Sequence, residues 1–450
     1  MFRYIVVIIV FLAACKSKSD YTTFTSDPIR YSKTVKELNN IVLENNFAPM
    51  VASRNYAYAN IAAYECMVAG DSSWQSLSGQ IRHMPAMPRL AVGTDIDYNL
   101  ASMLAFVKVG NAVTFPEGSM MHYYDMLLHE ADSMGIPGEK LKNTKLFADT
   151  IAGAVLAWSK TDNYSKTRGA SRYTVEEAPG RWVPTPPMYA TAVEPHWMEI
   201  RPMVLDSASC FMCKRPPAYD MGNKNGEFYK ALMEVKHIGD SLTPEQKHIA
   251  DFWDDNPFKM NVTGHVMYAT KKFSPAGHWM NIVGIGAQKA GADLHTTIAA
   301  YTKTSIALFD AFLACWDEKY RSNFVRPETV INQLIDPNWQ PYIQTPPFPS
   351  YVSGHSTISA AAAEVMTEYF DNISFTDTSL KEFGIENREI RSFRDAAKEA
   401  GMSRIYGGIH YSFDNTEGAM LGKKIGETVV ERIKLKKTEK KNPLTGKLPN

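Results

Sequence analysis

Two histidines in the C-terminal half of the chain stand beside residues that can bind and react with an oxyanion. His355 follows Ser353 and Gly354, and His410 comes shortly after Arg404. Arginine forks hold paired oxygens, while hydroxyl and backbone N–H groups add further donors. One imidazole can bond to the central atom of a tetrahedral oxyanion while the other moves a proton at the opposite face. The pattern indicates a site for phosphate or vanadate.

Two flanking segments add charge and orientation to this pair. Lys319 and Arg326 precede it, and Asp414 stands four residues after His410. That spacing places Asp414 on the same helical face, where it can hold the second ring nitrogen and fix the tautomer. Taken singly, an arginine is usually solvated and Ser353 is an ordinary helix cap. The oxyanion hypothesis therefore depends on the three segments together.

Predicted helix ends position these groups. A proline-rich loop, 344–349, leads to an alanine-rich run, 358–370, which predicts a helix that starts near His355. The unpaired N–H groups and the positive dipole end of that helix favour an anion. The longest helical stretch, about 280–319 with a possible break near Gly291, has few charges and is expected to be a central, buried helix.

Composition and periodicity predict an all-α globular protein. The 450 residues are 45% hydrophobic and 21% charged, and 48 basic residues balance 48 acidic ones. Zero net charge does not favour a nucleic-acid partner. Apolar residues recur at helical spacing in both halves, and no convincing strand pattern competes. We expect a two-part helical bundle with the oxyanion site in its C-terminal part.

Five segments are expected along the chain. A long proline-rich connection, about 164–220, either has a function of its own or clamps the two halves together. The predicted boundaries are a leader with an anchor cysteine (1–15), a tether (16–30), an N-terminal helical domain that includes the connection (31–220), a C-terminal catalytic helical domain (221–436) and a solvated tail (437–450).

The N-terminus has the pattern of an export signal. A basic start is followed by an apolar run that ends in Leu12-Ala-Ala-Cys15, and this run is too short to span a bilayer permanently. The ending resembles the lipobox of bacterial lipoproteins, which implies lipidation of Cys15 and a location in the bacterial envelope, on the periplasmic or outer-membrane side. Farther on, Cys210 and Cys213 form either a structural disulfide or two free thiols.

The three charged segments resemble the signature of the superfamily that unites type-2 phosphatidic acid phosphatases, bacterial acid phosphatases and vanadium-dependent haloperoxidases. Order and internal spacing both match. Val352 departs from the family pattern, which usually has proline there, and we expect a mild effect because this residue contributes shape rather than chemistry. The matching residues are Lys319, Arg326-Pro327, Ser353-Gly354-His355, Ser403-Arg404, His410 and Asp414.

Two aromatic residues shift the resemblance toward haloperoxidases. Trp316 and Phe348 look like the pair that lines the halide side of chloroperoxidase-type enzymes, where such rings make a dry pocket. The resemblance then implies vanadate bonded to His410, with His355 assisting protonation as peroxide binds and a halide as substrate. The residues that it implies for holding the vanadate oxygens are Lys319, Arg326, Ser353, Gly354 and Arg404.

Two alternatives stay open. As an acid phosphatase, the chain needs no cofactor: His410 attacks phosphorus of a phosphomonoester, with lipid phosphates among the candidate substrates, and His355 protonates the leaving alcohol. As a non-catalytic envelope lipoprotein, it would carry only a relic of the site. We rank this last because no key residue is lost.

Overall fold

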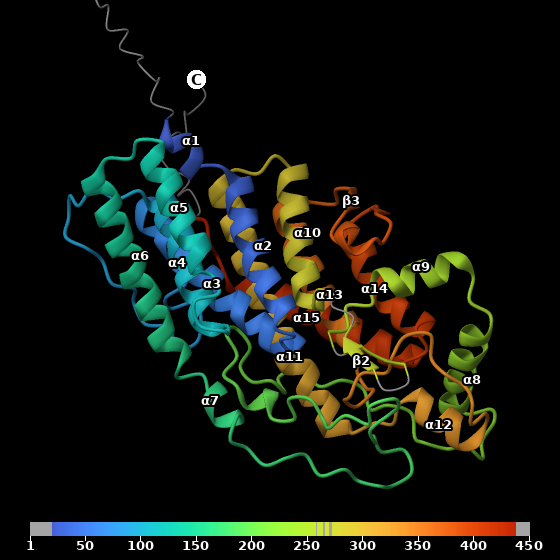
Figure 1. Ribbon diagram of the computed structural model, residues 1–450. Helices are drawn as coiled ribbons and strands as arrows, with labels where there is room; N and C mark the ends of the chain where they lie inside the picture. The colour runs from blue at the N-terminus through green and yellow to red at the C-terminus, as the bar shows by residue number, and fades with distance from the viewer. Residues whose placement is uncertain (1–19, 258, 264–265, 270–271, 438–450) are drawn as a thin grey trace, which may run out of the picture.

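The computed structural model describes residues 20–257, 259–263, 266–269 and 272–437. The predicted leader with Cys15 and nearly all of the predicted tail lie outside these residues. The described chain is mostly helical (Figure 1), which confirms the all-α prediction. Its strands form two short antiparallel hairpins, β1 (Met260–Thr263) with β2 (Val266–Ala269), and β3 (Phe375–Asp377) with β4 (Arg388–Ile390).

The N-terminal half is built around one helix that is buried on all sides. Helix α3 is buried from Pro49 to Met67 and packs against α4, α6 and the central helix of the C-terminal half. The predicted tether ends earlier than expected, because the chain is helical from Tyr21 and Phe24 is buried. The helices of this half are α1 (Tyr21–Thr25), α2 (Pro28–Glu44), α3 (Pro49–Gly70), α4 (Tyr98–Val113), α5 (Met121–Ser133) and α6 (Gly138–Ser159).

The C-terminal half surrounds α11 (Leu294–Ser322), whose side chains are almost all buried. Among the described helices, this one is long and apolar enough to cross a membrane, but it lies wholly inside the protein. The predicted break occurs at Gly291, whose φ of +63° ends α10. The other helices are α8 (Glu227–Asp240), α9 (Pro244–Phe252), α10 (Pro275–Lys289), α12 (Pro327–Leu334), α13 (Gly354–Phe370), α14 (Phe393–Tyr406) and α15 (Ser412–Arg432).

The proline-rich connection wraps along the lower edge of the molecule in Figure 1 and braces α11. Between α6 and α8 it has only two short helical turns, α7 (Tyr164–Thr167) and η1 (Trp197–Glu199). The carbonyl of Val193 accepts hydrogen bonds from Trp316 Nε1 (3.1 Å) and the Tyr320 hydroxyl (2.6 Å). Nearer the N-terminus of α11, the buried Asp310 carboxylate accepts hydrogen bonds from the backbone N–H groups of Met203, Val204 and Leu205.

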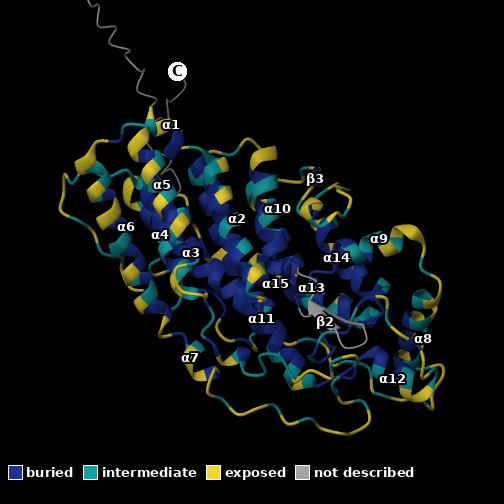
Figure 2. Ribbon diagram, in the orientation of Figure 1, coloured by how far each residue is buried: buried dark blue, intermediate teal, exposed yellow. Residues whose placement is uncertain are grey.

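Close helix packing brings α13 and α15 together. A Cβ atom on Gly422 of α15 would lie 1.9 Å from the carbonyl oxygen of Thr357, so only glycine permits this approach. The facing surfaces of both helices are buried (Figure 2). As a result, the start of α13 with His355 lies near the start of α15 with Asp414.

The cysteines of the described chain are all free thiols. Cys210 and Cys213 are half-buried in the connection, while Cys66 and Cys315 are buried in helices. Of the two outcomes expected for Cys210 and Cys213, the structure has the pair of thiols.

Candidate active site

Helix ends and loops meet at a small cavity in the C-terminal half. Its volume is about 50 Å³, enough for a few water molecules or one small oxyanion. Six predicted site residues line it, and the other four lie directly behind them. The lining residues are Trp316, Phe348, Gly354, His355, Arg404 and His410, and those behind are Lys319, Arg326, Ser353 and Asp414.

One ring nitrogen of His410 is hydrogen-bonded to a carboxylate, and the other faces the cationic groups. Its Nδ1 lies 2.8 Å from Asp414 Oδ2, and the Ser350 hydroxyl donates to the same carboxylate at 2.6 Å. This contact places the ring proton on Nδ1, so Nε2 carries the lone pair and accepts from Arg326, 3.1 Å away. Burial, followed by the charges of Arg326 and Lys319, lowers the pKa of His410 well below its usual value. The imidazole is therefore neutral and able to act as a ligand or nucleophile.

Lys319 and Arg326 bring two buried cations to this side of the site. Lys319, in the last turn of α11, donates to the carbonyls of Pro349 and Ser350, both at 2.9 Å. Arg326, just before α12, donates through Nε to Phe348 O and has one terminal nitrogen 3.1 Å from His410 Nε2. Burial lowers the pKa of both side chains. Cations that are this desolvated favour an anionic partner.

Arg404 approaches from the last turn of α14. Its Nε donates to the Ser403 hydroxyl at 2.9 Å, and a terminal nitrogen donates to the Trp253 carbonyl. Burial lowers the pKa of Arg404, and the nearby carboxylates of Asp254 and Asp255 oppose that shift. The guanidinium is fixed at the cavity wall by these contacts.

The start of α13 supplies the remaining predicted groups. Ser353 is the N-cap of α13, and its side chain accepts from the backbone N–H of Ser356. It therefore has an ordinary helix-capping role as well. Gly354 faces open space, because a Cβ there would have Trp316 as its nearest neighbour, at 4.0 Å. Burial, then the charges of Arg404 and His278, lower the pKa of His355 well below its usual value. A neutral His355 can accept a proton inside the cavity.

The predicted aromatic pair forms the apolar wall. The Trp316 and Phe348 ring centroids lie 5.0 Å apart. Both buried cations also lie over the Phe348 ring, with Lys319 Nζ and the Arg326 guanidinium carbon each 5.1 Å from its centroid. This ring therefore shields the cations from solvent on one side.

The sequence did not single out two parts of the site. One is Ser350, in the loop before α13, whose hydroxyl donates to the Asp414 carboxylate. His278, at the start of α10, lies between two buried carboxylates, with Nδ1 3.1 Å from Asp255 and Nε2 2.9 Å from Asp377. Asp255 in turn lies 3.8 Å from His355 Nε2. Sequence spacing carries no signal for these contacts, because they join segments far apart in the chain.

The donor set fits vanadate. Within the described residues, one terminal nitrogen of Arg326 and Nε2 of His355 are buried without a hydrogen-bond partner. An unsatisfied buried N–H donor is costly, and an oxyanion beside Arg326 would supply its missing acceptor, while the unpartnered His355 nitrogen could exchange a proton with such a ligand. The unprotonated Nε2 of His410, which accepts from Arg326 in this structure, would supply a ligand for the central atom.

Comparison with known proteins shows which proteins this chain is similar to as a whole. Residues 299–437 match the family model described as the second helical-bundle domain of VCPO. The crystal structure described as the first bacterial vanadium-dependent iodoperoxidase is 40% identical, with a TM-score of 0.87 over 92% of this chain and 98% of that one. No curated protein matches.

Two less similar solved structures share the fold. The holo and apo forms of a bacterial vanadium-dependent chloroperoxidase are each 17% identical, with a TM-score of 0.66. The match covers 86% of this chain and 92% and 95% of those chains, respectively. With 40% identity to a relative over nearly its whole length and an oxyanion cage in place, the chain belongs to the vanadium-dependent haloperoxidase family.

Proposed function

We propose that the protein is a vanadate-dependent haloperoxidase that oxidises iodide with hydrogen peroxide. The observation that carries the choice of iodide is the 40% identity to a bacterial iodoperoxidase over 98% of that chain. The chloroperoxidase structures, at 17% identity, share only the fold and do not argue for chloride.

The cationic and polar side chains would hold the cofactor. Lys319, Arg326 and Arg404 would neutralise the vanadate oxygens, and the Ser353 hydroxyl and the Gly354 N–H would donate to them. His410 would bind the central atom through Nε2, with Asp414 holding the ring from behind. When bound, vanadate supplies a Lewis-acidic centre that activates peroxide toward a halide without changing its own oxidation state.

His355 and the aromatic wall would serve the substrates. A neutral His355 can take a proton from hydrogen peroxide as the peroxide binds. It can return that proton to the peroxide oxygen that leaves as water or with the oxidised halide. Trp316 and Phe348 make the halide side of the cavity apolar, which excludes water from the oxidised halide.

A steady-state assay on the vanadate-loaded protein tests this proposal. We expect peroxide-dependent iodide oxidation that requires added vanadate and exceeds the rates with bromide and chloride. A His410→Ala variant should lose the activity, whereas His122→Ala, on an exposed helix surface, should keep it. Higher kcat/KM for bromide or chloride would overturn the choice of iodide.

The same preparation without vanadate addresses the phosphatase alternative. The cage could hold a phosphomonoester in place of vanadate, with His410 as nucleophile. Hydrolysis of a phosphomonoester by the vanadate-free protein, lost in His410→Ala and without any halide oxidation in the loaded form, would replace our proposal with a phosphatase.

We also propose that the mature protein is anchored in the bacterial envelope through a lipidated Cys15. The support is the Leu12-Ala-Ala-Cys15 pattern after an apolar run. Mass spectrometry of the mature N-terminus after expression in a bacterium tests it. Release of Cys15→Ala protein into the soluble fraction is expected, and an unmodified Cys15 in the wild type would contradict the proposal.

A further inference from the structure

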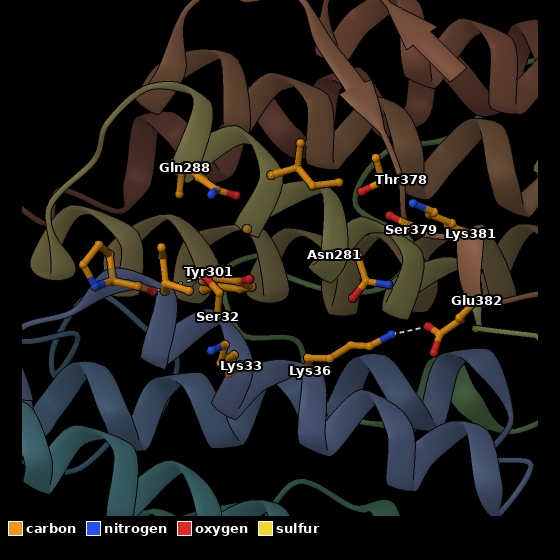
Figure 3. Close-up of a pocket in the computed structure, with 15 residues that line it drawn as sticks. Ser32, Lys33, Lys36, Asn281, Gln288, Tyr301, Thr378, Ser379, Lys381 and Glu382 are labelled. Carbon is orange, nitrogen blue, oxygen red and sulfur yellow. Dashed lines mark hydrogen bonds and ion pairs between the residues drawn. The ribbon is translucent and has the colours of Figure 1, made fainter. Parts of the chain in front are cut away.

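A second and larger cavity lies away from the active site. Its volume is about 550 Å³, within the range of small-molecule sites. It is open to solvent on one side and is lined by α2, α10, α11 and the segment that follows β3, including the turn η2 (Lys381–Phe383) (Figure 3). None of its lining residues lines the active-site cavity. The proposed haloperoxidase chemistry therefore makes no use of it.

The cavity carries an excess of positive charge. Lys33 and Lys36 reach it from α2, and Lys381 reaches it from the opposite wall. Lys36 is paired with Glu382, the acidic residue of this lining, and lies 3.9 Å from the centre of the Phe273 ring. Lys33 and Lys381 form no ion pair within the described part of the chain. Two ammonium groups on facing walls are thus available to an anion.

A half-buried amide between these walls has an unused donor. The Asn281 side chain lies in the middle of the cavity wall in Figure 3, and its Oδ1 accepts from Asn39 Nδ2 at 3.1 Å. Its Nδ2 is buried and has no hydrogen-bond partner among the described residues. Because an unmade buried hydrogen bond is costly, a ligand oxygen at this point would be stabilising. The amide and the two free lysines all donate, so they select an acceptor-rich group.

The other part of the lining is apolar. Ile29, Ile285, Ala287 and the Tyr301 ring contribute to it. Gly284 keeps space for the Tyr301 hydroxyl, since a Cβ there would lie 2.5 Å from that oxygen. The surface is suited to an apolar ligand body beside the cationic rim.

We propose that this cavity binds a small amphipathic organic anion. Its charged oxygen group would lie between Lys33, Lys381 and Asn281 Nδ2, and its apolar body would pack against Ile285 and Tyr301. Such a ligand matches both the charge and the apolar lining, whereas a neutral or cationic molecule would leave the lysines without a counter-charge. The proposal is independent of which halide the active site oxidises.

Fluorescence titration of the vanadate-loaded protein tests the proposal, with anilinonaphthalene sulfonate as the anionic probe. We expect one binding site per chain. The double variant Lys33→Met/Lys381→Met should weaken the affinity about tenfold, the loss expected for two partly exposed ion pairs. The matched control, Lys145→Met/Lys424→Met, removes two exposed lysines elsewhere and should leave the affinity unchanged. Equal affinity in all three proteins, or an equal loss in both double variants, would overturn the proposal.

Two further measurements test whether the probe's negative charge matters for binding and whether the probe binds in this cavity. Phenylnaphthylamine, a neutral probe of similar shape, should bind wild type and Lys33→Met/Lys381→Met equally well. Ile285→Trp, which fills the apolar part, should abolish binding of the anionic probe while thermal melting shows an intact fold. Wild-type affinity of a folded Ile285→Trp protein would place the probe elsewhere and refute the proposal.

Discussion

His410 Nδ1 lies 2.8 Å from a carboxylate oxygen of Asp414, in a contact closed to solvent. The four-residue spacing and the turn between α14 and α15 bring the two side chains together. The hydroxyl of Ser350 donates to the same carboxylate and helps to hold it in place. It sets which ring nitrogen faces the cavity, and so it sets the ability of His410 to bind the cofactor.

Replacing Asp414 with asparagine should therefore weaken vanadate binding. The amide cannot hold the Nδ1 proton as the carboxylate does, and we expect a loss of about 10- to 100-fold in affinity. Titration followed by vanadium NMR measures it. Asp240→Asn, on an exposed helix end, is the matched control and should bind as wild type does. Unchanged affinity in Asp414→Asn would show that the contact does not orient the ligand.

Replacing Arg326 with methionine should lower kcat/KM for iodide by about 10² to 10³, the usual cost of one charge-stabilising donor. The variant should also lose about 1–3 kcal/mol of stability, because the carbonyls of Phe348 and Ile409 would lose their buried donor. Assays and urea unfolding measure the two effects. Arg391→Met, at an exposed position, is the control and should change neither kcat/KM nor stability. An Arg326→Met protein as active and as stable as wild type would contradict the role of Arg326.

Replacing His355 with glutamine should reduce kcat more than vanadate affinity. Glutamine keeps polar atoms at the cavity but cannot move a proton at neutral pH, and loss of a general acid–base group typically costs about 10² to 10⁴ in rate. Steady-state kinetics with a parallel vanadate titration distinguish the two effects. His129→Gln, exposed on α5, is the control. Normal kcat with weakened vanadate binding would make His355 a cofactor ligand only.

The ion triad around His278 predicts a pH dependence of stability. Burial alone lowers the pKa of His278, but Asp255 and Asp377 outweigh it and raise the pKa to about 10. A raised pKa gives stability that is complete below the unfolded value of about 6.5 and disappears as pH rises through about 10. We expect the free energy of unfolding to fall by a few kcal/mol between pH 7 and pH 10.

The His278→Gln variant tests whether this imidazolium is the cause. The variant should be less stable than wild type at pH 7, because two buried carboxylates lose their cation. It should also lose most of the wild-type pH dependence in urea unfolding between pH 7 and pH 10. An equally steep decline in the variant would assign the effect to other groups.

The sequence by itself determined the helical class and the chemistry of the oxyanion cage. Helical periodicity is a local property, and residues of the cage stand at helix ends that local signals mark, as Ser353 does at the start of α13. The predicted tether, 16–30, includes a short helix, α1, in which Phe24 is buried against the rest of the protein. Burial of one side chain against a distant helix is not visible in local composition.

Only the tertiary structure decided which groups support the cage and where a second ligand can bind. Ser350 reaches Asp414 and His278 reaches Asp377 across long separations in the chain. The larger cavity likewise joins Lys33 with Lys381. Contacts of this kind depend on how whole helices pack, whereas the spacing within a motif is fixed by the geometry of a single helix or turn.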